Sequence, residues 1–416
     1  MSELKQTLNA FTGTALFLNI VVGAGLLVIP GLAFEQVGIS ALLTWLLCIV
    51  VALPLVSVFI ILGKYYPDAG GISHYAYKAF GSWMQKVAAF LLLGAVVLGL
   101  PAVALTGGHY LNSVLPFSVH FYASSMIILA TLLNVISIDK VSKVLGVIGS
   151  SVIVILLILL IISFIGLNVD PNEGYSFIEQ NSFDIDIIFL PFMMIFFAFT
   201  GWEVGSHSAE EFRNPERDFP LAMIFSFGIA SVFYLAIAWV VQNSHMQTGF
   251  KSPFIELIYP VLGSNGSVIV AFVATLLVFA NLFGAIWAIS RLVYSLGRDT
   301  ILPSVLADIK NGIPRRALVV VMTALLIGVL LDLSTVANLD SLMALSGQNF
   351  LILYGIAGAS LFVLTQKLWV KCIAGSVLVI VIAVLQVAGV SFVYPLGLVI
   401  VASIFHFRQL KLRVRL

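Results

Sequence analysis

The sequence predicts an all-α integral membrane protein with twelve transmembrane helices. Of its 416 residues, 61% are hydrophobic and only 9% are charged, and the mean hydropathy is +1.13. Such a chain has too little polar surface to cover a soluble globule of this size. A membrane-spanning helix needs about 20 apolar residues, so the uncharged intervals of the sequence mark the individual spans.

These intervals define the spans in order. The interval between Lys86 and Asp139 is too long for one helix at ~1.5 Å per residue, so it holds two spans that turn near Pro116. Every other interval holds one span. The intervals are 5–35, 40–63, 86–139, 143–170, 186–211, 218–251, 256–291, 317–333, 340–365, 372–389 and 391–407.

The distribution of basic residues predicts the orientation of the chain, because Lys and Arg collect in the cytoplasmic loops of membrane proteins. With the N-terminus inside, every Lys and Arg except Lys251 falls on the cytoplasmic side of the twelve spans. We therefore expect both termini in the cytoplasm. The polar start of the chain lacks a basic region and a small-residue cleavage site, so we expect the first span to be retained.

Composition also narrows the partners and cofactors. The formal net charge is +1 and there is no basic stripe to neutralise phosphates, so we expect no nucleic acid partner. Cys48 and Cys372 lie far apart in apolar spans, without metal-ligand spacing. We expect no metal and no cofactor. The expected partners are a small-molecule substrate and the lipid bilayer, and the sequence leaves monomer and homodimer both open.

Two glycine-containing segments interrupt predicted spans. They are residues 22–25 (VGAG) in the first span and residues 199–203 (FTGWE) in the sixth. A break frees backbone amides and carbonyls at membrane depth, which is tolerated only where these groups line a cavity enclosed by protein. Paired breaks at corresponding positions indicate the substrate site of a secondary transporter. The alternative is that Gly23 and Gly25 only allow close helix packing.

Three predicted cytoplasmic segments carry ordered motifs. They are residues 66–71 (YPDAGG) with 79–81 (AFG), residues 209–220 (AEEFRNPERDFP), and residues 290–315, which begin with SRL and end with IPR. With these motifs the chain resembles the amino acid-polyamine-organocation (APC) transporter superfamily, clearly over the first ten spans and weakly over the last two. The short chain and the NPERDFP run are most similar to the bacterial exporters of methionine and branched-chain amino acids.

This resemblance implies a LeuT-like fold, which is a five-plus-five inverted repeat with unwound first and sixth helices. It divides the chain into a first repeat (1–168), a second repeat (185–366), and two further helices with a cytoplasmic tail (367–416). It also implies a multi-pass secondary transporter of the bacterial inner membrane that works by alternating access. The first, second, sixth and seventh spans would rock against the third, fourth, eighth and ninth.

The two breaks offer complements to both charged ends of a zwitterionic amino acid. Half-helix N-termini present unpaired amides, which suit the carboxylate, and half-helix C-termini present unpaired carbonyls. By resemblance, the carbonyls of Phe197 and Thr200 would accept from the ammonium, and Gly201 would keep the break open. The expected substrate-binding residues are Val21, Gly23, Ala24, Gly25, Phe197, Thr200, Gly201 and Trp202.

The pocket for the substrate side chain is expected to be apolar. Aromatic residues such as Phe17, Phe197 and Trp202 flank the breaks, and Glu203 is the one acidic residue near them. This pattern favours methionine and the branched-chain amino acids, and it disfavours arginine, lysine and polyamines. Because Glu203 stands without a clustered base or metal set, we expect no enzymatic activity.

Glu203 is the one carboxylate predicted to lie within the bilayer. An ionised carboxylate at the bilayer centre costs at least ~2.5 kcal/mol, and intramembrane acids are functional candidates by default. Desolvation favours the protonated form, so proton coupling or pH gating is one hypothesis. The alternative is a permanently protonated side chain that holds the unwound segment through hydrogen bonds.

Charged residues near the cytoplasmic ends of the spans are expected to form an inner gate, although the general enrichment of basic residues inside is an alternative explanation. The expected gate residues are Glu211, Arg213, Arg217 and Arg298. Some relatives carry a Lys in the fifth span in place of a bound sodium, whereas this chain has GSS at 149–151. Sodium coupling therefore stays open.

Proton-coupled export of small neutral amino acids is the function that we expect. The alternative is uptake or exchange, possibly linked to sodium. A membrane receptor or sensor is the more distant alternative.

Overall fold

The computed structural model describes residues 8–66, 71–136, 154–167, 185–203, 209, 212–244, 246–298, 301–310, 313–387 and 392–414. These residues are helical throughout, apart from the connecting loops and two isolated backbone bridges. Seven of the described helices are long and apolar enough to cross a membrane. The prediction of an all-helical membrane protein with several apolar spans is therefore confirmed.

The described helices follow one another along the chain. The bounds are α1 (Ala10–Val21), α2 (Ala24–Val37), α3 (Ala41–Tyr65), α4 (Gly71–Phe80), α5 (Ser82–Asn112), α6 (Val119–Ile136), Val154–Ile165, α8 (Ile185–Phe189), α9 (Phe192–Ala198), α11 (Pro215–Gln242), α12 (Pro253–Arg298), α13 (Arg315–Leu333), α14 (Leu339–Leu364), α15 (Leu368–Val387) and α16 (Val393–Val414). Two short 3₁₀ segments, Gly38–Ser40 and Ser304–Ala307, lie between helices.

The helix bounds agree with the predicted intervals at several points. The connection between α5 and α6 contains Pro116, as the sequence predicts. Two features were not predicted. α4 is a short helix outside the predicted spans, and α12 contains a bend at Gly263, whose φ of 60° lies in the left-handed region that glycine adopts without strain. Much of the fifth predicted span lies outside the described residues.

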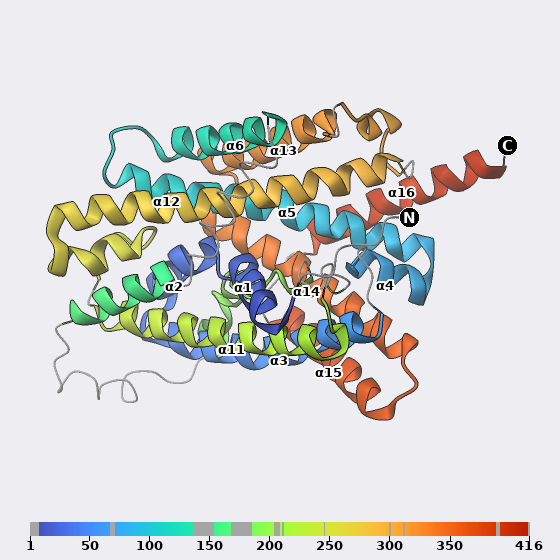
Figure 1. Cartoon of the computed structure of the whole chain (residues 1–416), viewed down its shortest axis with the longest axis horizontal. Helices are drawn as coiled ribbons and strands as arrows, with labels where there is room; N and C mark the ends of the chain where they lie inside the picture. The colour runs from blue at the N-terminus through green and yellow to red at the C-terminus, as the bar shows by residue number, and fades with distance from the viewer. Residues whose placement is uncertain are drawn as a thin grey trace.

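The helices form two groups. In the first group α5, α6, α12 and α13 contact one another, and Figure 1 shows α6 and α13 along one edge of the molecule. The second group consists of α1, α2, α3, α9 and α11, which are joined through contacts with α11 and α9. α14 contacts both groups, through α5 and α9.

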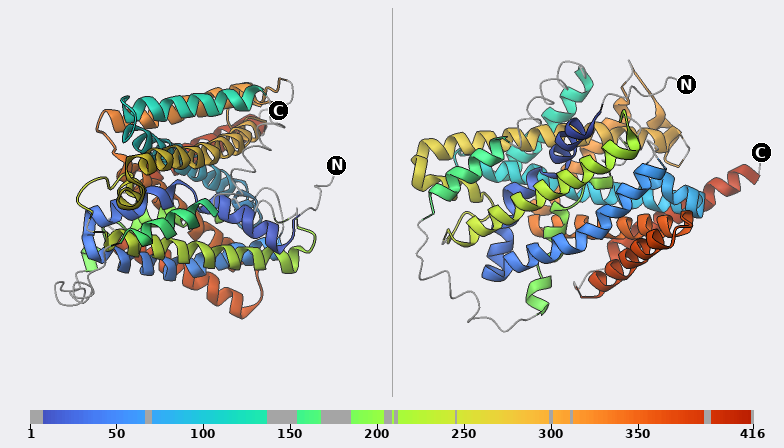
Figure 2. Two further views of the ribbon diagram at one scale, coloured as in Figure 1. Left: turned by 60° about the vertical axis from the view of Figure 1, so that its left-hand side comes forward. Right: turned by 60° about the horizontal axis from the view of Figure 1, so that its bottom comes forward.

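The last two helices lie at the periphery. α15 packs against α14 and α3, and α16 packs against α5. The C-terminal part of α16 extends beyond the other helices, as Figure 1 and the right view of Figure 2 show. The two helix groups and α14 therefore form the centre of the described structure.

Close packing between α14 and α9 predicts a glycine requirement at Gly347. A Cβ added there would overlap the carbonyl oxygen of Met193, a backbone atom that cannot move independently. We expect Gly347→Ala to lower the free energy of unfolding by about 1–3 kcal/mol, because overpacking forces neighbouring elements apart. The midpoint of thermal unfolding of the purified protein in detergent measures this.

Gly375→Ala is the matched control. Gly375 lies in α15, and an added Cβ there would meet no atom within 4 Å. Alanine is the better helix former by about 1 kcal/mol, so this variant should be as stable as the parent protein or slightly more stable. Equal unfolding midpoints for the two variants would contradict the packing argument.

Candidate functional site

The first predicted break lies between α1 and α2. α1 ends at Val21, Val22 leaves the helical conformation with φ −85° and ψ 70°, and α2 begins at Ala24 after Gly23 with φ −108° and ψ −138°. The amide of Gly23 donates to the carbonyl of Val21 at 3.0 Å. The first amides of α2, at Ala24 and Gly25, have no partner within their helix, as at any helix N-terminus.

The second predicted break follows α9. Thr200 donates to the carbonyl of Phe197 twice, from its hydroxyl at 2.7 Å and from its amide at 3.2 Å. Gly201 has a φ of 110°, a conformation that favours glycine because it lacks a Cβ. Its amide donates to Oε2 of Glu203 at 3.0 Å. Side chains therefore replace the backbone hydrogen bonds that a continuous helix would make.

The two breaks meet in space. A Cβ added at Gly25 would lie 3.2 Å from the Cβ of Ala198, so α2 and α9 approach closely at this point. The hydroxyl of Tyr234 lies between them, 2.7 Å from the carbonyl oxygen of Ala198 and 3.1 Å from that of Val21. Tyr234 belongs to α11, and its proton is shared between the last turns of both half-helices.

Glu203 is buried, with 1% of its surface exposed. Its Oε2 accepts from the hydroxyl of Tyr354 in α14 at 2.6 Å, in addition to the bond from Gly201. The ring of Tyr354 is fixed by edge contacts with Phe59 and Phe196, whose ring centroids lie 4.7 and 5.9 Å away. The carboxyl group thus connects the unwound segment after α9 to α14.

Two of the aromatic residues around the breaks are buried in ring contacts, and a third is half-buried. Phe199 and Trp202 are fully buried, and both contact Phe227 of α11, at 6.4 and 5.8 Å between ring centroids. Phe197 is half-buried and lies beside α5, since a Cβ added at Gly99 would be 2.8 Å from its ring. Of the predicted aromatic binding residues, Phe197 is the one that the structure leaves partly exposed.

Aromatic side chains pack around α1, on the N-terminal side of the first break. The ring of Phe17 in α1 contacts those of Phe212 and Phe219, with centroids 6.0 and 5.9 Å apart. The backbone amide of Arg213, one of the predicted gate residues, donates a hydrogen bond to the carbonyl of Leu8 at 2.9 Å. The segment before α1 is therefore tied to the segment before α11.

The other predicted gate residues are only partly described. Arg217 lies in the first turn of α11. Arg298 ends α12 and has an interaction partner. Glu211 lies outside the described residues. The ion-pair gate therefore stays a prediction.

The C-terminal half of α2 also packs against other segments. A Cβ added at Gly31 would overlap the carbonyl oxygen of Phe250, and the ring of Phe250 lies 6.2 Å from that of Phe34. Gln36 donates to Asp340 in the first turn of α14 at 3.0 Å. α2 is thus held against both the α11–α12 connection and α14.

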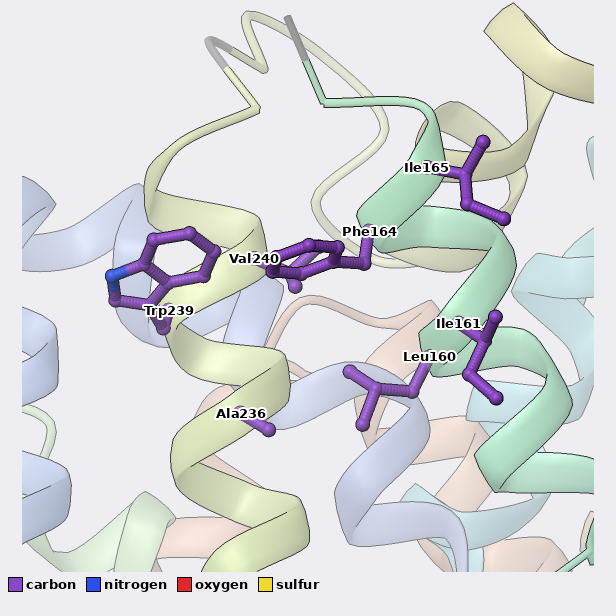
Figure 3. Close-up of a pocket in the computed structure, with 7 residues that line it drawn as sticks. All are labelled: Leu160, Ile161, Phe164, Ile165, Ala236, Trp239 and Val240. Carbon is purple, nitrogen blue, oxygen red and sulfur yellow. The ribbon is translucent and has the colours of Figure 1, made fainter. Parts of the chain in front are cut away.

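A separate cavity of about 350 Å³ lies between Val154–Ile165 and α11 (Figure 3). Its lining consists of Leu160, Ile161, Phe164, Ile165, Ala236, Trp239 and Val240. None of these side chains offers a charge or a carbonyl-type acceptor, so the cavity lacks the complements that a zwitterion needs. The paired breaks are the better candidate site.

Interrupted helices that meet within a membrane protein are typical of the substrate sites of secondary transporters. The sequence profile of the family described as "Amino acid permease" matches residues 8–409. The chain therefore belongs to the amino acid permease family of the APC superfamily. It is an amino acid transmembrane transporter, a multi-pass membrane protein and not an enzyme.

Several named bacterial proteins are similar to this chain. The L-methionine/branched-chain amino acid exporter YjeH of Escherichia coli (strain K12) is 27% identical over 359 residues, which cover 85% of each chain. The uncharacterized amino acid permease YecA of Bacillus subtilis (strain 168) is 26% identical over 311 residues, 73% of this chain and 72% of its own. The branched-chain amino acid permease BcaP of Bacillus subtilis (strain 168) is 21% identical over 334 residues, 74% of this chain and 70% of its own.

Sequence reasoning missed Tyr234 and Tyr354, which lie in apolar spans where an aromatic residue resembles ordinary packing. We expect Tyr234→Phe to reduce amino acid transport about tenfold, because two carbonyl groups at membrane depth lose their donor. Initial rates in proteoliposomes measure this effect.

Tyr394→Phe serves as the control for this experiment. The hydroxyl of Tyr394 also donates to a carbonyl on a neighbouring helix, that of Gly94 at 2.9 Å, but away from the breaks. Its removal should change the transport rate less than the removal of the Tyr234 hydroxyl. Equal losses in both variants would mean that Tyr234 contributes only general stability.

Proposed function

We propose that the protein exports small neutral amino acids, methionine and the branched-chain set, from the bacterial cytoplasm by proton-coupled alternating access. The observation that carries this proposal is the meeting of the two breaks at Gly25 and Ala198, with the Tyr234 hydroxyl between their carbonyls. The naming of one relative as an exporter of these amino acids supports the substrate and the direction.

The backbone groups at the breaks suit a zwitterion. The free amides of Ala24 and Gly25 at the start of α2 would bind the carboxylate, where the helix dipole is positive. The ammonium would take carbonyls at the ends of α1 and α9. Tyr234 donates to those of Val21 and Ala198 and leaves the second lone pair of each oxygen as an acceptor for the ammonium.

The environment of the breaks favours a neutral side chain. Phe197 is the half-buried aromatic residue beside them, and the buried residues around it are apolar or aromatic. The carboxyl of Glu203 is bound by Tyr354 and Gly201. A cationic substrate side chain would need a counter-charge that these residues do not supply, because an unpaired charge in such surroundings is costly.

Alternating access would use the two helix groups of the fold. The α1, α2, α3, α9 and α11 group would move against the α5, α6, α12 and α13 group, in line with a LeuT-like inverted repeat of residues 1–168 and 185–366. Protonation of Glu203 would be coupled to this movement, because its partner Tyr354 lies in α14, which contacts both groups. Cytoplasmic termini and the inner gate complete the proposal.

Sodium-linked uptake or exchange is less well supported. Ser290 in α12 offers a hydroxyl oxygen as one possible sodium ligand, and this hydroxyl donates to the carbonyl of Trp287 in its own helix at 2.8 Å. This bond leaves the oxygen lone pairs free, so one hydroxyl ligand alone supports sodium binding only weakly.

Binding by the purified protein tests the substrate class. We expect methionine and leucine to bind more tightly than alanine, arginine to bind much more weakly, and the affinities to change with pH and not with sodium. Isothermal titration in acidic and alkaline buffer, each with and without sodium, measures this. Binding that requires sodium would contradict the coupling, and a preference for arginine would contradict the substrate class.

Substitution of Glu203 tests proton coupling. Glu203→Gln keeps the size and an acceptor for Tyr354 and Gly201 but cannot titrate. We expect it to bind methionine while losing accumulation driven by a pH gradient in proteoliposomes. Full transport with an unchanged pH profile would instead support a purely structural carboxyl group.

Tyr354→Phe separates the titration of the Glu203 carboxyl from its hydrogen bond to Tyr354. It removes the 2.6 Å hydrogen bond but leaves the carboxyl able to titrate. We expect a shifted pH profile with proton coupling retained. If Tyr354→Phe abolished coupling as completely as Glu203→Gln, the titrating group would have to be assigned to the pair and not to Glu203 alone.

A further inference from the structure

Asn281 lies against the first break from the side of α12. A Cβ added at Gly23 would be 2.9 Å from Nδ2 of Asn281 and 3.7 Å from its Oδ1. Asn281 is halfway along the straight part of α12, between the bend at Gly263 and the last residue, Arg298. A polar side chain therefore reaches the unwound segment at the middle of a membrane helix.

The amide group of Asn281 makes no hydrogen bond to any described residue, in contrast to two other polar residues of α12, Thr275 and Ser290. The hydroxyl of Thr275 donates to the carbonyl of Ala271 at 2.7 Å, and that of Ser290 donates to Trp287. An amide side chain without a partner is costly at membrane depth. Asn281 is half-buried, so its amide group remains accessible to a bound group that is not part of the described protein.

The position of Asn281 indicates the chemistry of that group. Asn281 lies beside Gly23, which directly precedes the amides of Ala24 and Gly25 at the positive end of α2. Backbone and side-chain N–H donors that converge on one point suit an oxyanion, and a carboxylate accepts several such bonds. Gly23 itself is required by space, because a side chain would displace the Asn281 amide.

We propose that Asn281 binds the carboxylate of the transported amino acid, together with the first amides of α2. This proposal rests on the proposed function, because the ligand is the substrate of the paired breaks. Asn281 then selects substrates with a free carboxylate over those in which it is blocked. The ammonium and the side chain are bound elsewhere, at the carbonyls and near Phe197.

The experiment compares methionine with methioninamide, in which the carboxylate is replaced by a neutral amide. Binding to the purified full chain is measured for the parent protein, Asn281→Asp and Asn281→Leu. We expect Asn281→Asp to weaken methionine binding more than about tenfold, because a carboxylate faces a carboxylate. Methioninamide binding should change much less, so the ratio of the two affinities falls in both variants.

Two further glycine variants control for structural effects. Gly284→Ala changes the same helix where an added Cβ meets no atom within 4 Å, and it should leave both affinities unchanged. Gly23→Ala should reproduce the loss of the methionine preference by displacing Asn281. The unfolding midpoint of each variant identifies any protein that fails to fold.

The outcomes separate this proposal from its alternatives. Equal losses for methionine and methioninamide would overturn it, because Asn281 would then only position the break. If Asn281→Asp retained methionine binding and sodium strengthened that binding, the side chain would be a cation ligand. This result would also overturn the proposal. If the parent protein bound no neutral amino acid, the proposed function would fail first, whereas normal parent binding with an unchanged ratio would refute Asn281 alone.

Discussion

The requirement that every backbone polar group within a membrane be satisfied by protein governs this structure. The protein meets it at the breaks with side chains. The Tyr234 hydroxyl serves the carbonyls of Val21 and Ala198, and Thr200 serves that of Phe197. Each such side chain stands in for a helical hydrogen bond, so the breaks are specified by residues of the breaks themselves and of α11.

These side-chain hydrogen bonds connect the two breaks to different helices. Tyr234 ties both half-helices to α11, which belongs to the same helix group. Glu203 instead ties the second break to α14 through Tyr354. The carboxyl group is therefore the point at which a relative movement of the helix groups would strain a buried hydrogen bond. A proton on or off that oxygen changes the strength of the bond, which gives the coupling hypothesis a structural basis.

The sequence predicts the helices and the breaks better than the contacts between them. The turn near Pro116 and the interruptions at residues 22–25 and 199–203 follow from local signals, namely charge, proline and glycine. Tyr234 and Asn281 do not, because a single tyrosine or asparagine in an apolar span has the same local pattern whether it packs, binds or bridges. Their roles depend on which helices are neighbours, and helical periodicity carries no information about that. The bend at Gly263 was missed for a related reason, since one glycine in a helical pattern is usually tolerated.

The proposed selectivity for neutral substrates would follow from the limited number of charged and polar partners at the breaks. At the breaks, the charge complements are backbone dipoles, which match the ends of any amino acid and discriminate none of them. Glu203, the carboxyl group at this site, already accepts two hydrogen bonds within the protein. A lysine or arginine substrate would have to compete for that oxygen and break the connection to α14, whereas a methionine or leucine side chain leaves it intact. In the proposed transporter, the hydrogen bonds that satisfy the broken helix would thus also disfavour cationic substrates.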